Sequence, residues 1–307
     1  MFDHFAWSVL ATPVLVLLGT VLLADRLRPD LALRVLAWSA VVAATASTAN
    51  LVVFGLKALA ELPPVAALGD WSSAAVVADT ASAPWVSRLS LVWAVTVGVL
   101  VTAQWVRRRR VVRATRAEVD WLRPRGEVVT IADERVDAFA LPGRPGRIVL
   151  TTGILDVLDD RQRAAVIAHE RAHLAGAHHR LLWLTRLAAT AHPLLWPVAH
   201  RVAYLVERAA DEAAAAELGD RRDVARAIGV VALAASARVV AARASGLPSA
   251  LGTTPGAVPR RVTALMAPQE RRRWPVAVPV LLAAATVVWT VECVYDFQQL
   301  LALASLR

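Results

Sequence analysis

The sequence predicts a mainly α-helical membrane protein that carries one α+β domain outside the bilayer. Of its 307 residues, 57% are hydrophobic, and the mean hydropathy is +0.50, which is too apolar for an ordinary soluble domain. Long apolar runs alternate with arginine-rich segments, and one of these segments, residues 107–273, is long enough to bury a core of its own. These observations define a membrane region with a single large domain inserted into it.

Four apolar runs are long enough to span a bilayer, which requires about 20 residues. They are Phe5–Ala24, Val35–Leu56, Leu89–Val106 and Trp274–Tyr295. The first run has neither a basic start nor a clear cleavage site of small residues, so we interpret it as a retained helix and not as a signal peptide. The predicted organisation is a membrane region at 1–106 with three spans at 5–24, 35–56 and 89–106, a domain at 107–273, and a fourth span with a short tail at 274–307.

The arginines predict the orientation of these spans, because basic residues gather on the cytoplasmic side. Arginines follow the first run, Arg107–Arg110 directly follow the third run, and Arg271–Arg273 precede the fourth run. The loop at 57–88, by contrast, has basic residues only at its two ends. We therefore expect a multi-pass protein of the cell membrane with a cytoplasmic domain, and with both termini and the 57–88 loop outside.

The net charge of +9 follows largely from this asymmetry and from contact with anionic lipid of the bilayer. No nucleic-acid-binding motif accompanies the charge, so we expect no direct nucleic-acid partner. The single cysteine, Cys293, excludes an internal disulfide and a metal site built from several cysteines.

Within the domain, short strands precede helices. The apolar stretches Val128–Ala132, Val136–Leu141 and Arg147–Thr152 end at turn residues and are typical of strands. A helix is expected to begin near Asp159, with Gln162 at the capping-box position. Prolines and polar residues interrupt the apolar segment Leu181–Leu205, which therefore predicts a helical hairpin packed on the domain or lying in the inner interface, and not a fifth span. Helices at Val202–Leu218 and Asp223–Ser245 and a loop at Gly246–Pro259 complete the domain.

The predicted helix after Asp159 carries the motif H-E-x-x-H at His169, Glu170 and His173. Residues four apart on a helix share a face, so both imidazoles can bind one Zn²⁺. Glu170 lies between them and can take a proton from water at the open metal position. A charged, solvated helix face is the alternative explanation of the motif, which by itself is short enough to occur by chance.

A zinc site of this kind needs a third protein ligand. Glu207 and Asp211 lie on a later predicted helix and are also four residues apart. Glu207 is the expected third ligand, and Asp211 is expected to bind the outer nitrogen of a ligating histidine and to fix its tautomer. A surface helix of alternating charge would explain this pair by itself, but its combination with His169 and His173 favours one Zn²⁺ per chain.

Other polar residues of the domain are weaker candidates. If the metal helix continues, His178 lies about 140° around it from His173, so His178 and His179 are interpreted as a solvated helix end. Tyr204 or Arg261 could stabilise an oxyanion at the metal, and the sequence does not choose between them.

Four motifs occur in one order: AFALPG at 138–143, IVLTTG at 148–153, AHERAH at 168–173 and ERAAD at 207–211. This order resembles the integral-membrane gluzincins, most closely the BlaR/MecR-type antirepressor metallopeptidases and more distantly the HtpX and CAAX-protease type. The similarity runs over about Val136–Asp211, and the predicted arrangement of four spans also looks like that of BlaR/MecR. The resemblance implies a zincin-like (gluzincin) metallopeptidase domain between the third and fourth spans.

The resemblance also implies roles for individual residues. His169, His173 and Glu207 would be the zinc ligands, Glu170 the general base, and Asp211 a partner of a ligating histidine. The strand around Ile148, Val149, Leu150 and Thr151, or alternatively Val136–Leu141, would pair with the substrate as an edge strand. Sensor members of this family carry an extracellular penicillin-binding domain after the fourth span, and the present sequence is expected to lack it.

The function predicted from the sequence is a membrane-embedded zinc endopeptidase that hydrolyses a cytoplasmic or membrane-associated protein in antirepressor-like regulatory signalling. Its expected partners are a protein or peptide substrate, a transcriptional repressor being one candidate, and the lipid bilayer. The alternative is a membrane signalling scaffold in which zinc is structural and a cytoplasmic regulator is bound without cleavage. A small-molecule transporter is disfavoured because the spans carry almost no charge.

Overall fold

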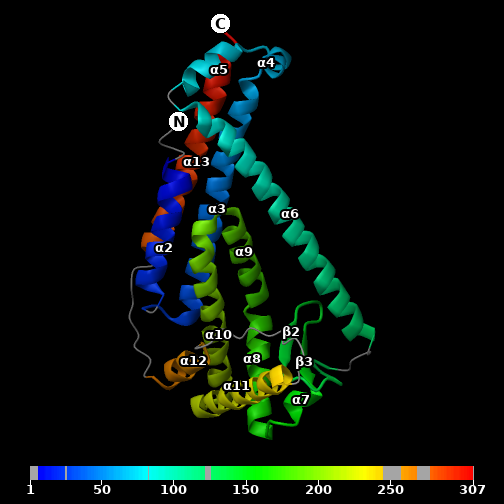
Figure 1. Cartoon of the computed structure of the whole chain (residues 1–307). Helices are drawn as coiled ribbons and strands as arrows, with labels where there is room; N and C mark the ends of the chain where they lie inside the picture. The colour runs from blue at the N-terminus through cyan, green and yellow to red at the C-terminus, as the bar shows by residue number, and fades with distance from the viewer. Residues whose placement is uncertain are drawn as a thin grey trace.

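The structure, a computed structural model, describes residues 6–24, 26–81, 83–121, 126–244, 257–267 and 277–306. It is mostly helical and contains one small sheet. Figure 1 shows long helices that diverge from a narrow end, where α4 and α5 lie, toward a broad end that holds the sheet and helices α7, α8, α11 and α12. The chain therefore separates into a bundle of long helices and an α+β region at its broad end.

The bundle is built on α3 (Pro29–Ala60), which lies between the N-terminal and C-terminal helices. Short η1 (Ala6–Ala11) and α2 (Thr12–Leu23) pack on it, as does α13 (Ala277–Ala304). At the narrow end the chain forms α4 (Pro63–Gly69) and α5 (Ser73–Thr80) before it turns into α6 (Pro84–Trp121). The buried face of α3 is rich in alanine, and small side chains allow helices to approach closely.

Two helices of the described chain, α3 and α6, are long and apolar enough to cross a membrane. They contain the predicted runs Val35–Leu56 and Leu89–Val106. The apolar window of α6 is only 11% buried within the protein, so most of its side chains face the surroundings. Val9–Thr20 forms a shorter apolar helix. The outer two predicted spans extend into residues that the structure does not describe, and four spans remain a prediction.

The sheet has three strands: β1 (Val128–Ile131), β2 (Ala138–Leu141) and β3 (Arg147–Thr151). Its order is β1-β3-β2, with β1 parallel and β2 antiparallel to β3. The three predicted strands are thus present with slightly shorter bounds. The prediction that Ile148, Val149, Leu150 and Thr151 form an edge strand is wrong, because β3 is the central strand and both of its sides are paired. Of the two alternatives, only the strand ending at Leu141 has an open side within the described sheet.

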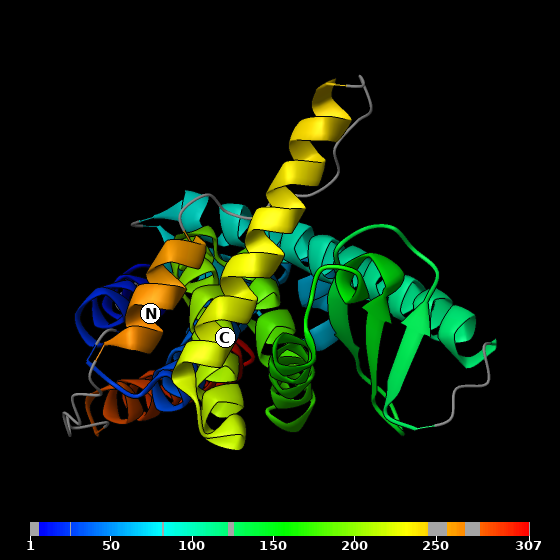
Figure 2. The same cartoon turned by 90° about the horizontal axis from the view of Figure 1, so that it is seen from below.

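Helices cover both faces of this sheet. Val119 of α6 packs with Val129, Leu141 and Val149 on one face. On the other face, Ile148 and Leu150 pack against α7 (Thr152–Leu155), α8 (Asp160–Ala175) and α11 (Arg221–Ala244), as seen from below in Figure 2. The sheet is thereby fixed between the end of a long bundle helix and the helix that carries the H-E-x-x-H motif.

The predicted hairpin is formed by α9 (His178–Ala191), the short η2 (Pro193–Leu195) and α10 (Trp196–Leu218). Both of its long helices rise beside α3 in Figure 1, and the hairpin's apolar residues share a core with α2 and α3. The hairpin thus packs largely on the bundle, whereas the sequence predicted that it packs on the domain or lies in the inner interface. The lower part of α10 packs instead on α8, α11 and α12 (Ala257–Met266). Helix α10 therefore connects the bundle to the α+β region. The predicted 246–259 loop lies largely outside the described residues, and its last three residues belong to α12.

Candidate functional site

Helix α8 begins with the predicted capping box. The Asp159 side chain accepts a hydrogen bond from the Gln162 backbone at 2.8 Å, and the Gln162 side chain accepts one from the Asp159 backbone at 3.1 Å. These contacts satisfy backbone donors that have no partner within the helix. Ala165 and Ala168 then bury one face of α8 against α10 and α11. The helix is therefore held along the length that carries His169, Glu170 and His173.

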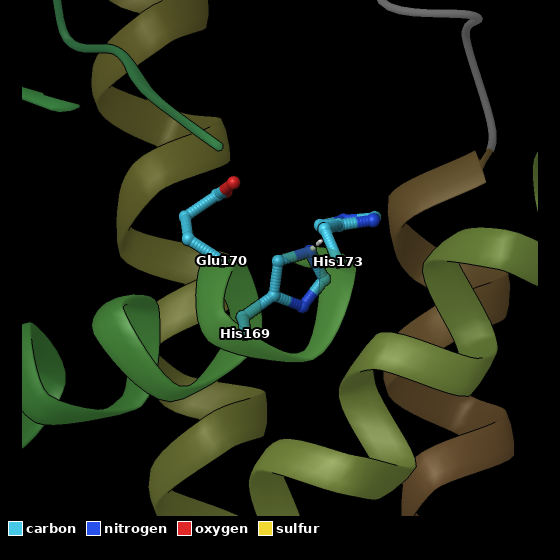
Figure 3. Close-up of side chains that lie close together, drawn as sticks. All are labelled: His169, Glu170 and His173. Carbon is cyan, nitrogen blue, oxygen red and sulfur yellow. Dashed lines mark hydrogen bonds between the residues drawn. The ribbon is translucent and has the colours of Figure 1, made fainter. Parts of the chain in front are cut away.

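The two motif histidines present their Nε2 atoms to one point. The two atoms lie 3.1 Å apart, and the rings are oriented edge to face. Figure 3 shows the rings beside each other and the Glu170 carboxyl group on their flank. One ligand atom from each of these three side chains lies within 4.8 Å of the others, as the spacing along one helix predicted.

Glu207 of α10 joins this pair from a different helix. Its carboxylate oxygens lie 3.6 Å from Nε2 of His169 and 3.8 Å from Nε2 of His173. Two imidazoles and one carboxylate are the donor set of a catalytic zinc site. The residues present therefore fit Zn²⁺.

Asp211 lies one turn further along α10, behind the first histidine. Its Oδ1 is 3.0 Å from Nδ1 of His169, and its side chain is 3% exposed. A proton held on Nδ1 by this carboxylate leaves Nε2 of His169 with a lone pair for a metal. The predicted contact between Asp211 and the outer nitrogen of a ligating histidine is thus within hydrogen-bond distance.

Arg261 of α12 contacts both Asp211 and Glu207. Its Nε and Nη2 donate to the two oxygens of Asp211 at 2.8 and 2.6 Å, and its Nη1 lies 3.0 Å from Glu207. The guanidinium was one of two candidates for stabilising an oxyanion, but its donors are directed at these two carboxylates. The other candidate, Tyr204, lies between Arg201 and Arg260, with its ring 5.3 and 4.9 Å from their guanidinium carbons.

The prediction that His178 belongs to a solvated helix end is wrong. Helix α8 ends at Ala175, and Ala177 adopts a left-handed conformation with φ of 48°, so His178 starts a new helix. Its side chain is buried, and its Nδ1 lies 3.0 Å from Nδ1 of His173. When the His173 ring donates its Nδ1 proton to His178, its Nε2 is free to bind a metal.

The ionisation of the site follows from these contacts. Burial alone would lower the pKa of His169, but Asp211 and Glu207 raise it to about 9. Burial and the neighbouring His169 lower the pKa of His173 to about 4. Burial works to raise the pKa of Glu207, but His169 and Arg261 hold it at about 2. Near pH 7 the Glu207 carboxylate is therefore ionised and His173 is neutral, as metal ligands must be, whereas His169 is protonated and must release a proton when a metal binds.

Glu170 has a different environment from Glu207. It is 9% exposed, and its burial raises its pKa to about 7, while the charge of His169 opposes this rise. The backbone N–H of Ala140, on β2, also contacts the carboxyl group and acts to lower the pKa. A carboxyl group with a pKa near neutrality can both accept and release a proton.

The open side of β2 faces this carboxyl group. The N–H of Thr151 donates to the carbonyl of Asp137 at 3.2 Å, so residues 137, 139 and 141 direct their backbone groups toward β3. Ala138 and Ala140 consequently direct theirs to the open edge, in agreement with the contact between Ala140 and Glu170. An extended peptide added to this edge would pass beside Glu170.

Comparison with known protein families supports a peptidase site in this region. Residues 102–196 match the model of peptidase family M48. The matched segment runs from α6 through the sheet and α8 to the hairpin, so it contains His169, Glu170 and His173. It supports assignment of this region to a zinc metallopeptidase family. The match ends before Glu207 and Asp211, whose assignment rests on their geometry. Searches of curated proteins and of solved structures gave no significant match.

Proposed function

We propose that the chain is a membrane-embedded zinc endopeptidase. The observation that carries the proposal is the convergence of His169, His173 and Glu207 on one point, with Glu170 beside it. The match to peptidase family M48 supports the reaction class. A purely structural zinc site would be closed by a fourth protein ligand. Among the described residues, His169, His173 and Glu207 supply three ligands, and the remaining side chain of the cluster, Glu170, is the proposed base.

When bound, Zn²⁺ would polarise the scissile carbonyl and acidify water at the site. Glu170 accepts a proton from the attacking water and passes it to the leaving amine, for which its raised pKa is suited. Asp211 and His178 hold the two histidine rings in the orientations that bind metal. The outer edge of β2 aligns the peptide through its backbone, which favours extended substrates.

The proposed topology follows the arginine distribution. Helices α3 and α6 cross the membrane, together with spans at each end of the chain, and the α+β region lies on the cytoplasmic side. Both termini then lie outside. In this arrangement the substrate is a cytoplasmic or membrane-associated protein. The resemblance to BlaR/MecR-type peptidases favours regulatory cleavage, with a transcriptional repressor as one candidate substrate.

Cleavage of a complex peptide library tests this proposal. The detergent-purified protein and its Glu170→Gln variant would be incubated with the library, and the products read by mass spectrometry. Peptides cut only by the wild type would establish the peptidase, and zinc analysis should give about one Zn²⁺ per chain for both proteins. Cleavage retained by Glu170→Gln would refute the assigned base. Zinc-loaded protein that cuts nothing would instead favour the scaffold function.

A further inference from the structure

A second open site lies beside the candidate zinc centre but is distinct from it. It is a groove of about 1030 Å³ between residues 105–113 of α6, the turn from β2 to β3, the last turns of α8 and the first turns of α9. Figure 1 shows that α6 and α9 diverge toward the sheet. The groove's lining includes none of His169, Glu170, His173 or Glu207. The candidate zinc centre therefore does not account for this groove.

The groove is strongly basic. Six arginines line it: Arg108, Arg109, Arg113, Arg144, Arg171 and Arg180. The one carboxylate in the described lining is Glu127, whose Oε2 lies 3.1 Å from Nη2 of Arg171. Five arginines thus surround one space without a matching negative charge in its lining. Such a concentration of like charge attracts anions and is stabilised by binding them.

Two of these arginines are already held in place by tryptophans. The Arg108 guanidinium lies 4.6 Å from the Trp183 ring centre and donates to the carbonyl of His179 at 3.1 Å. The Arg109 guanidinium lies 3.6 Å from the Trp105 ring centre. A guanidinium that stacks on an aromatic ring keeps donors at its edge available for an oxyanion. The groove thus has a partly preorganised wall.

The groove's position indicates the class of anion. The apolar run Leu89–Val106 of α6 ends where the groove begins, at Trp105 and Arg108. Tryptophans and arginines at the end of a span lie at the level of the lipid headgroups. Basic pockets between helices on the cytoplasmic side are suited to phosphate-bearing headgroups, and guanidinium groups bind phosphate through paired hydrogen bonds.

We propose that this groove binds the headgroup of an anionic phospholipid and favours headgroups with two phosphates. The inference rests on the proposed membrane location but not on peptidase activity. One wall of the groove is the turn that follows β2, and Arg116 of α6 donates to the carbonyl of Pro142 in that turn at 2.9 Å. A bound headgroup would therefore link the sheet to α6 and to the bilayer surface.

The test uses the full-length protein in a neutral detergent and counts bound lipid by native mass spectrometry. The probes are cardiolipin, phosphatidylglycerol and phosphatidylcholine. The groove variant is Arg113→Gln/Arg144→Gln/Arg180→Gln, which changes three exposed arginines that have no acidic partner among the described residues. The matched control, Arg107→Gln/Arg110→Gln/Arg222→Gln, removes the same charge at exposed positions outside the groove.

We expect the wild type and the control to retain cardiolipin most strongly, phosphatidylglycerol less strongly, and phosphatidylcholine least. The groove variant should bind cardiolipin roughly ten- to a hundred-fold more weakly, as expected for the loss of three arginine–phosphate contacts. Equal losses in the groove variant and the control would overturn the proposal, because they would indicate unspecific attraction. Full displacement of cardiolipin by millimolar pyrophosphate would assign the groove to a free phosphate compound. Binding of an acidic peptide in place of lipid would assign it to substrate.

Discussion

Oδ1 of Asp211 lies 3.0 Å from Nδ1 of His169, and this contact selects the ring nitrogen that is left for a metal. The same carboxylate is held by Arg261, so its position does not depend on the histidine alone. Three helices meet in this network: α8 through His169, α10 through Asp211 and α12 through Arg261.

Replacement of Asp211 by asparagine should weaken zinc binding roughly ten- to a hundred-fold, because the neutral amide no longer stabilises the Nδ1–H tautomer of His169. Zinc affinity would be measured by competition with a chromophoric chelator. Glu212→Gln is the matched control, since Glu212 pairs with Arg221 at 2.6 Å and lies outside the network. Equal zinc affinities of the two variants would contradict the assigned role of Asp211.

Replacement of His178 by alanine should lower zinc affinity about tenfold, because Nδ1 of His173 loses the partner that lies 3.0 Å away. His178→Asp should restore most of the affinity, since a carboxylate also accepts the Nδ1 proton. The neighbouring variant His179→Ala is the control. The absorption spectrum of the Co²⁺-substituted protein provides a second measurement, since it changes when a ligand ring reorients. An unchanged spectrum and affinity in His178→Ala would refute this role.

Removal of zinc should lower the thermal midpoint of the protein. A ligand at a hundred times its Kd adds about 2.7 kcal/mol to stability, which corresponds to a loss of about 5 °C on its removal. The measurement is differential scanning fluorimetry with and without a chelator. The double variant His169→Ala/His173→Ala should show no response to the chelator. A response of equal size in that variant would place the stabilising metal elsewhere.

Replacement of Ala138 by proline should reduce kcat/KM for an identified peptide about tenfold. The N–H of Ala138 is directed to the open edge of β2. Proline has no N–H, so it would remove the proposed backbone hydrogen bond to the substrate and leave the pairing with β3 intact. Ala138→Val, which keeps the N–H, is the matched control. Peptide cleavage at the wild-type rate by Ala138→Pro would show that substrate does not pair with this edge.

Local patterns in the sequence predicted the elements that depend on neighbouring residues. The capping box at Asp159 and Gln162 and the shared face of His169 and His173 are properties of one helix, and both are present in the structure. The hairpin around Pro193 and the three short strands were predicted from breaks in the apolar pattern. Four spans and the orientation of the chain remain predictions. Among the described helices, α3 and α6 are long and apolar enough to match two of these spans.

The sequence by itself determined the H-E-x-x-H motif, the helix that carries it, and the shared helix face of Glu207 and Asp211, because residue spacing fixes which side chains share a helix face. Only the tertiary structure decided the strand order that places β2, and not β3, at the edge. It also decided that Ala177 turns the chain and brings His178 back to His173, and that Arg261 reaches Asp211 from α12. The physical reason is that these contacts join segments whose relative positions depend on packing of the whole domain, which residue spacing does not encode.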